Sequence, residues 1–332
     1  MIRITRLCYD TGMVTNQKYS LISYTYAHLA VDLGCFYLLF HYDYTDAILI
    51  YLLYDLIAFG LQFLFGALLD KYYKLPLGII GIIFVILAFF LPSPLRIIVC
   101  GIGNALFHIE GGRDSIQYSN GKYARLGIFV SSGTIGITLG KYLGLNYANT
   151  IPLILLAVAF ILCLLIKKTE LKLTYNREKN PSYLIIILAL FIIFIRSLGG
   201  ISASYLTDNV VLSCIVITLG KALGGILADK FGAKRVIILS YIIAIATLSL
   251  GNNSTLILIG IGCLNISMPI SLGILARQFP AHPGFAFGLS TLALILGALP
   301  SFYISLNNPY LIFFALLSAL VASYFALTIK EV

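Results

Sequence analysis

The sequence predicts an all-α membrane protein of twelve transmembrane helices, arranged in two six-helix bundles that repeat one another. Two observations predict this fold class. The 332-residue chain is 60% hydrophobic and 11% charged, with a mean hydropathy of +0.99, which leaves too little polar surface to coat a soluble domain. In addition, a motif that closes one long apolar run in the first half recurs at the end of another in the second half.

The recurring motif places a glycine four residues before an Asp-Lys pair. Gly66-Ala-Leu-Leu-Asp70-Lys71 is echoed by Gly225-Ile-Leu-Ala-Asp229-Lys230, and the two copies are offset by 159 positions. Gly101-Ile-Gly103 and Gly260-Ile-Gly262 keep the same offset. Parallel repeats of this kind are typical of one large class of secondary transporters.

Each half contains six apolar segments of about the length that a membrane-spanning helix needs, roughly 20 residues for 30 Å of hydrocarbon. The predicted spans are 20–40, 47–69, 75–92, 94–112, 124–146, 150–166, 183–205, 207–228, 235–250, 254–276, 284–303 and 309–329. We therefore divide the chain into a cytoplasmic N-terminal segment (1–19), an N-terminal bundle (20–166), a cytoplasmic linker (167–182) and a C-terminal bundle (183–329).

Lysine and arginine are concentrated before the first span and in the loops that follow the even-numbered spans, whereas the alternate loops carry almost none, Arg96 being the exception. By the positive-inside rule both termini are cytoplasmic, and we expect the plasma membrane of a prokaryote. The same bias explains the net charge of +9 as attraction to an anionic leaflet, so no nucleic-acid partner is needed. The six cysteines stand singly, so we expect packing roles, no metal site and no cofactor.

The motif has a physical interpretation. A glycine lets a neighbouring helix approach closely, and an aspartate one turn later, at the membrane face, can cap the positive N-terminal end of another helix. We expect Asp70 and Asp229 to form such a latch. The cations of the two loops could hold the latch in register through charge pairs and contacts with anionic lipid. The alternative is that they are ordinary charges of the positive-inside rule. These cations are Lys71, Lys74, Lys230, Lys234 and Arg235.

The paired motif resembles the loop signature of the major facilitator superfamily. Two further stretches, His28-Leu-Ala-Val-Asp32-Leu-Gly and the segment from Gly101 through His108-Ile-Glu110 to Arg113, resemble its fosmidomycin-resistance branch. The chain departs from the pattern at Ile109, where the branch has proline, and at Tyr73, where the superfamily has glycine. The resemblance implies the major facilitator fold, a latch that closes the cytoplasmic side in the outward-open state, and a central cavity lined by spans one, four, seven and ten.

Ionisable side chains inside the spans are the candidate functional residues, because a charge at the helix centre costs at least ~2.5–3.5 kcal/mol on insertion scales. We expect a substrate and proton site formed by His28, Asp32, Asp55, Asn104, Lys141, Arg196 and Lys221. His108, Glu110 and Arg113, at the inner end of span four, are assigned with the latch to gating.

Each assignment has a structural alternative. His28 and Asp32 could be a hydrogen-bonded pair that only holds the bundle together. Asp55 and Lys141 could snorkel outward, Lys221 could support the latch, and Arg196 could be structural.

The function predicted from these residues is secondary active transport by alternating access. Asp32 beside His28 is the expected proton site, and the excess of buried cations favours a small polar or anionic substrate. Efflux coupled to protons is the first choice, as an antiporter; a proton-coupled importer is the alternative, followed by a non-transporting receptor. No catalytic constellation is present, so we predict no enzyme, and we expect a monomer.

Overall fold

The computed structural model describes residues 2–146, 150–167, 181–204, 207–250, 253–303 and 308–329. These residues form α-helices and one 3-10 helix, with no strand among them. The α-helices are α1 (Ile2–His41), α2 (Ala47–Ala58), α3 (Gln62–Lys71), α4 (Leu77–Ala88), α5 (Leu95–Ser119), α6 (Ala124–Asn146), α7 (Ile151–Leu164), α8 (Tyr183–Ser204), α9 (Val210–Phe231), α10 (Ala233–Leu250), α11 (Ser254–Gln278), α12 (Pro283–Ala298) and α13 (Pro309–Ala326); the 3-10 helix η1 (Leu299–Phe302) follows α12.

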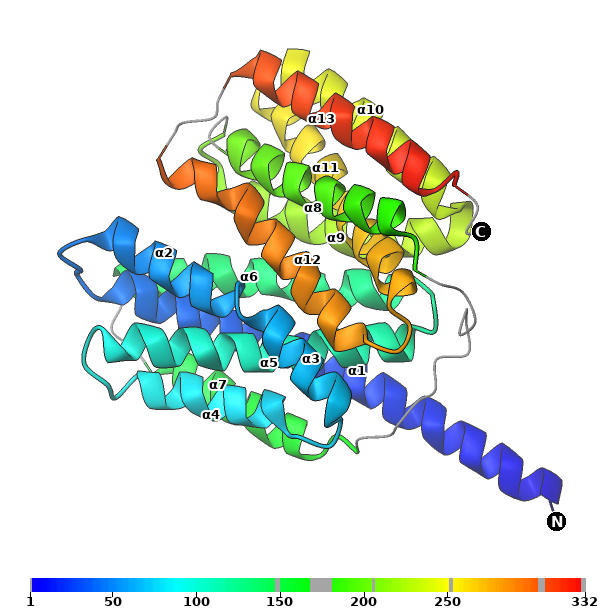
Figure 1. Ribbon diagram of the computed structural model, residues 1–332. Helices are drawn as coiled ribbons and strands as arrows, with labels where there is room; N and C mark the ends of the chain where they lie inside the picture. Colours follow the sequence, from blue (N-terminus) through cyan, green and yellow to red (C-terminus); the bar gives the residue numbers. More distant parts are fainter. Residues whose placement is uncertain are drawn as a thin grey trace.

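The helices form two bundles that lie side by side, α1–α7 in one and α8–α13 in the other (Figure 1). Each bundle has its own hydrophobic core. Only a few side chains cross over: Leu272, Ala276 and Phe287 of the second half join the first core, and Tyr123 of the first half joins the second. The two halves predicted from the repeat are therefore separate packing units that meet along α3, α6, α9 and α12. The proposed linker falls almost wholly outside the described residues, at 168–180.

The helices agree with the predicted spans except at three places. Helix α1 begins at Ile2, not at residue 20, so the expected N-terminal segment is helical, and it projects beyond the bundle (Figure 1). Helix α5 continues to Ser119, past the predicted end at 112, because its polar last turns are buried rather than exposed to water. The second span is divided into α2 and α3 around Gly60.

Seven segments of the described chain are long and apolar enough to cross a membrane, among them Ala47–Lys71, which contains both α2 and α3. Helices α4 and α7 are apolar but shorter. Polar side chains start several helices at the predicted outer face: Asp46 accepts a hydrogen bond from the backbone N–H of Leu49, and Asn209 from that of Leu212. Such N-caps satisfy backbone donors that the first turn of a helix leaves unpaired.

Candidate functional site

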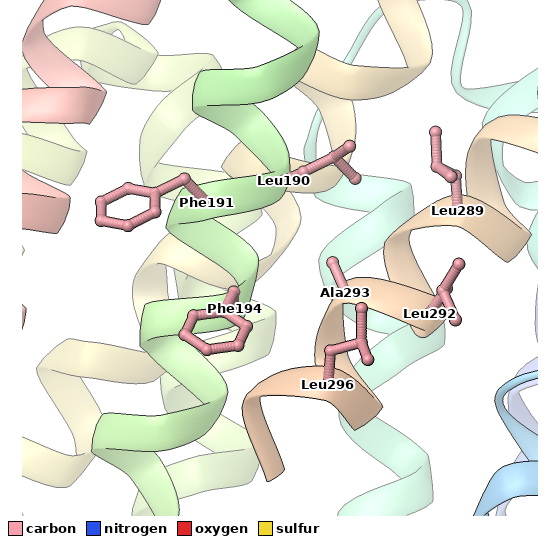
Figure 2. Close-up of a pocket in the computed structure, with 7 residues that line it drawn as sticks. All are labelled: Leu190, Phe191, Phe194, Leu289, Leu292, Ala293 and Leu296. Atoms are coloured by element: carbon pink, nitrogen blue, oxygen red, sulfur yellow. The ribbon is translucent and has the colours of Figure 1, made fainter. Parts of the chain in front are cut away.

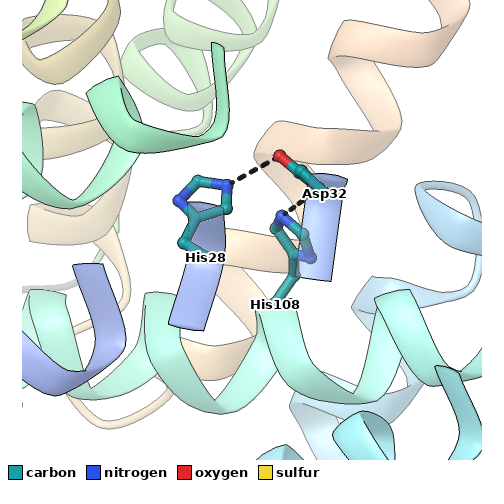
Figure 3. A group of neighbouring side chains, drawn as sticks. All are labelled: His28, Asp32 and His108. Carbon is teal, nitrogen blue, oxygen red and sulfur yellow. Dashed lines mark ion pairs between the residues drawn. The ribbon is translucent and has the colours of Figure 1, made fainter. Parts of the chain in front are cut away.

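The middle of the first bundle contains a buried cluster of His28, Asp32 and His108. Helix α1 supplies His28 and Asp32 one turn apart, and α5 supplies His108 (Figure 3). The Nε2 atom of His28 lies 3.3 Å from Asp32 Oδ2, and that of His108 lies 3.5 Å from Asp32 Oδ1. The two imidazole rings meet edge to face with centroids 4.5 Å apart. One carboxylate therefore faces two imidazoles in a site from which water is nearly excluded.

Backbone carbonyls fix the orientation of both rings. His28 Nδ1 lies 2.8 Å from the carbonyl oxygen of Phe129, and His108 Nδ1 lies 3.0 Å from that of Asn104. Because a carbonyl can only accept, each Nδ1 is the protonated donor. A neutral ring then presents an unprotonated Nε2 to Asp32, so an ionised carboxylate meets two lone pairs. The cluster needs an added positive charge, as a proton or a cation.

The surroundings of Asp32 hold it in place. Asn104 Nδ2 donates to Asp32 Oδ1 at 3.2 Å. Gly133 of α6 packs directly on the cluster, because a Cβ there would lie 2.4 Å from His28 Nε2 and 2.5 Å from Asp32 Oδ2. Asn104 therefore contacts the cluster, and Gly133 is a neighbour of the cluster that sequence reasoning missed.

A second buried network begins at Glu110, two residues after His108, and ends at Asp70. The hydroxyl of Tyr24 lies 2.9 Å from Glu110 Oε1 and 3.0 Å from Asp114 Oδ2. Glu110 also accepts from the backbone N–H of Gly78 at the start of α4. Arg113 donates to Asp114 at 2.9 Å, and its Nε lies 3.6 Å from Asp70 Oδ1. Glu110 and Arg113 therefore lie toward the predicted gate. His108 lies in the Asp32 cluster instead, and its assignment to gating stays a prediction.

The two motif aspartates each contact a helix N-terminus in the other half. Asp70 accepts from the backbone N–H groups of Gly284 and Phe285 at 2.9 and 2.8 Å, at the start of α12. Asp229 accepts from those of Tyr123 and Ala124 at 2.8 and 2.9 Å, at the start of α6.

Glycines make this approach possible. A Cβ on Gly66 would lie 2.3 Å from the carbonyl oxygen of Gly284, and one on Gly225 would lie 2.3 Å from that of Tyr123. Carboxylate and glycine thus act together at both contacts, which we call the latches.

The loop cations do not pair with the latch aspartates. Lys71, Lys74 and Lys230 lie over the adjacent aromatic rings of Tyr72, Tyr73 and Phe231. Lys234 donates to Thr328 Oγ1, and Arg235 is exposed. Within the described chain none of the five forms an ion pair, so the expected charge pairs are absent there. Arg113 from the neighbouring helix is the cation beside Asp70 instead.

Arg196 and Lys221 lie in the second half, near its contact with the first. Arg196 of α8 is 7% exposed, and its Nε has no hydrogen-bond partner among the described residues. It lines a cavity of about 40 Å³ between the halves, together with Val130 of α6 and the hydroxyl-bearing residues Ser271, Ser290 and Thr291 of α11 and α12. Lys221 Nζ donates to Thr134 Oγ1 of α6 at 2.7 Å. The lysine therefore bridges the halves and has a partner, whereas the arginine faces a cavity.

Asp55 and Lys141 do not join these groups. Lys141 is exposed, with its Nζ 4.9 Å from the centre of the Phe40 ring, which corresponds to the snorkelling alternative. Asp55 is half-buried in α2 and its side chain makes no hydrogen bond or ion pair within the described residues. The residues expected to form one substrate and proton site therefore do not all line one cavity.

A larger pocket is the wrong kind for a polar substrate. It has a volume of about 370 Å³ and lies between α8 and α12, lined by Leu190, Phe191, Phe194, Leu289, Leu292, Ala293 and Leu296 (Figure 2). None of these side chains can form a hydrogen bond. The Arg196 cavity is therefore the better candidate for a polar or anionic substrate.

Comparison with solved structures identifies the architecture. A variant of the E. coli fucose:proton symporter FucP matches with a TM-score of 0.73 at 13% identity, over 94% of this chain and 98% of that chain. A second structure, of FucP described as a major facilitator superfamily transporter in the outward conformation, matches with a TM-score of 0.70 at 15% identity, over 93% of this chain and 98% of that chain. The human organic anion transporter TETRAN matches with a TM-score of 0.66 at 13% identity, over 93% and 99%.

This chain has the major facilitator fold. No protein-family model and no curated protein matches the sequence, and identities this low carry the fold rather than an activity. The major facilitator fold agrees with the predicted twelve spans, with α2 and α3 forming one of them.

Proposed function

We propose that the chain is a secondary active transporter that works by alternating access. The observation that carries this proposal is the reciprocal latch, in which Asp70 and Asp229 each cap a helix of the opposite half. Two bundles that each have their own hydrophobic core, with capping hydrogen bonds where they meet, can rock about a site between them. A non-transporting receptor or an enzyme would need no such paired, releasable contact, and the major facilitator fold of FucP and TETRAN is that of transporters.

Arg196 is the proposed substrate contact. A buried guanidinium keeps its charge and costs free energy unless a counter-charge or dipoles balance it. Within the described chain it has no ion-pair partner, so a small anion or a polar compound with an anionic group would supply one. Ser271, Ser290 and Thr291 line the same cavity, and each of their hydroxyls donates to a backbone carbonyl of its own helix; the guanidinium is therefore the donor group available to an anion. Lys221 contributes less to this argument than predicted, because Thr134 already accepts from it.

The His28–Asp32–His108 cluster is the proposed coupling site. It needs one added positive charge, and the predicted coupling ion is the proton. The cluster lies in the first bundle and Arg196 in the second, so the two sites belong to the two rocking parts. Efflux is the proposed direction, from the resemblance to the fosmidomycin-resistance branch; import is the alternative, since FucP is a proton symporter.

Distance measurements between spin labels test alternating access without knowledge of the substrate. In a background without native cysteines, one pair of labels would be placed on Lys74→Cys and Phe231→Cys, at the latch ends of the halves. A second pair would be placed on Asp43→Cys and Tyr310→Cys, at the opposite ends. We expect the two distances to change in opposite senses between populations. Two single, fixed distances at every pH and with every ligand added would contradict the proposal.

Counterflow of labelled small carboxylates in proteoliposomes tests the substrate class. Loading vesicles with each unlabelled compound and imposing a proton gradient of either sign also reveals the direction. Neutral sugars serve as the control set, and transport of these with no transport of any carboxylate would overturn the role of Arg196.

A further inference from the structure

The three members of the His28–Asp32–His108 cluster have the donor types of a transition-metal site. One ligand atom from each residue lies within 4.8 Å of the others, and all three residues are buried. Imidazole nitrogen with carboxylate oxygen suits zinc and its first-row neighbours, whereas magnesium and calcium prefer sets made only of oxygen. Three protein ligands with one position left for water or a substrate group is a known zinc arrangement.

The ring orientations point in the same direction. In metal sites the ligating histidine almost always donates its other ring N–H to a carbonyl or carboxylate, which fixes the tautomer. Here both Nδ1 atoms already meet backbone carbonyls, of Phe129 and of Asn104. Both Nε2 lone pairs are thereby directed to the same carboxylate. Asn104, which donates to Asp32 Oδ1 at 3.2 Å, orients that carboxylate from outside the cluster.

The spacing within the cluster is wider than that of direct charge-assisted hydrogen bonds. A charge-assisted N–H···O hydrogen bond is about 2.7–2.9 Å long, and both imidazole–carboxylate distances, 3.3 and 3.5 Å, exceed this. Ligand atoms held tetrahedrally at about 2.1 Å from a zinc ion lie roughly 3.4 Å from one another. The two imidazole–carboxylate separations, one to each oxygen of Asp32, are close to the edge of such a coordination shell, and all three ligand atoms lie within 4.8 Å of one another.

We propose that His28 Nε2, His108 Nε2 and the Asp32 carboxylate bind one divalent transition-metal ion of the zinc type. Binding does not depend on transport. Its meaning for transport rests on the function proposed above, in which this cluster is the coupling site. The sequence did not reveal the site because its ligands come from two helices, with no Cys or His spacing typical of a metal motif.

Purified protein stripped with chelator would be titrated with Co²⁺, whose visible absorption reports tetrahedral coordination, and with Zn²⁺ and Mg²⁺ by calorimetry. We expect one Zn²⁺ or Co²⁺ per chain and no binding of Mg²⁺. His108→Ala and Asp32→Asn should each weaken Zn²⁺ binding by more than about 100-fold. Asn104→Ala should weaken it by about 10–100-fold, as loss of an outer partner does.

His41→Ala is the matched control. His41 also directs its Nδ1 to a carbonyl, that of Gly144, at 3.3 Å, but it faces no carboxylate within the described chain, and its loss should leave Zn²⁺ binding unchanged. Gly133→Ala is a second test that keeps all three ligands, because its methyl group would enter the space beside His28 Nε2 and Asp32 Oδ2; binding should be lost.

Two results would overturn the metal site. One is wild-type protein that binds neither Zn²⁺ nor Co²⁺; this measurement needs no variant and is independent of folding defects. The other is binding that survives His108→Ala and Asp32→Asn at wild-type strength. If the spin-label distances change in opposite senses but the protein binds no metal, the metal site is wrong and the transporter proposal stands. If the protein binds the metal but the distances stay fixed, the transporter proposal is wrong and the metal site stands.

Discussion

Asp70 and Asp229 occupy equivalent positions in the two halves and make equivalent contacts across them. Each accepts two backbone N–H hydrogen bonds of 2.8 to 2.9 Å from the first turn of a helix in the opposite half. The symmetry is not complete, because Asp70 also has Arg113 at 3.6 Å. At the second latch, Arg277 instead donates to the carbonyl of Gly121 and stacks on Tyr123.

The first prediction is that Asp70→Asn and Asp229→Asn each shift the protein away from the latched state. An amide retains one acceptor oxygen but turns an N–H₂ group toward the second backbone N–H, and a buried donor left without a partner costs about 1–3 kcal/mol. The latch-end distance distribution should broaden toward longer values, and turnover should fall more than expression does. Asp46→Asn is the control, since Asp46 caps α2 in its own half. If both variants keep the latch-end distances of the wild type, the aspartates do not hold the latch closed.

The second prediction concerns the latch glycines. Gly66→Ala and Gly225→Ala each place a methyl group against a backbone oxygen of the other half at 2.3 Å, and backbone cannot move aside cheaply. Both variants should open the latch end and slow turnover at least as much as the aspartate variants. Gly200→Ala should have no effect, since no atom lies within 4 Å of a Cβ there. The latch-end spin-label distances measure this. If they are the same in Gly66→Ala, Gly225→Ala and Gly200→Ala, close backbone approach is not the reason for glycine at positions 66 and 225.

The parts of the fold that follow from hydropathy and local chemistry were predictable. Apolar length located the spans, and the glycine–aspartate spacing identified the residues at the latches. The break at Gly60 was not predicted, because the apolar run continues through it; in the fold, the hydroxyl of Thr291 of α12 lies 3.2 Å from the carbonyl oxygen of Phe59 beside the break. The end of α5 was also missed. Charged residues such as Arg113 and Asp114 are typical of a loop at the membrane surface, and their ion pair, which lets them be buried in the helix, is visible only in the fold.

Side-chain partners from distant segments were the main limit for the site. Tyr24, His28 and Asp32 recur every fourth residue, a spacing that puts them on a common helix face, and all three are buried. The spacing could not show which partners the residues of α5 contact. His108 and Glu110 lie about 200° apart around that helix, so His108 faces Asp32 while Glu110 faces Tyr24 and Gly78. Asp114, which contacts Tyr24 and Arg113, was missed for the same reason.

The third prediction is that Arg196→Lys raises the apparent KM for an anionic substrate several-fold with little change in expression. The ammonium keeps the charge but lacks the planar fork that pairs with a carboxylate through two hydrogen bonds. Arg196→Gln should lower transport further. Lys141→Gln is the control, because that cation lies outside the cavity over Phe40. Uptake kinetics with the carboxylate found by counterflow would measure this, and an unchanged KM in Arg196→Gln would remove the residue from the substrate site.

The fourth prediction is that Asp32→Asn separates coupling from exchange. The substitution keeps the shape of the side chain and removes the charge that two imidazoles face, so the cluster no longer needs an added cation. Accumulation driven by a proton gradient should be lost, while exchange of substrate at equal pH survives. The assay should contain chelator, so that no bound metal contributes. Asp55→Asn is the matched control, a half-buried carboxylate of α2 with no partner in the described chain; it should accumulate substrate as the wild type does. If Asp32→Asn still concentrates substrate under a proton gradient while Asp55→Asn does not, the coupling site lies on α2 instead of at the cluster.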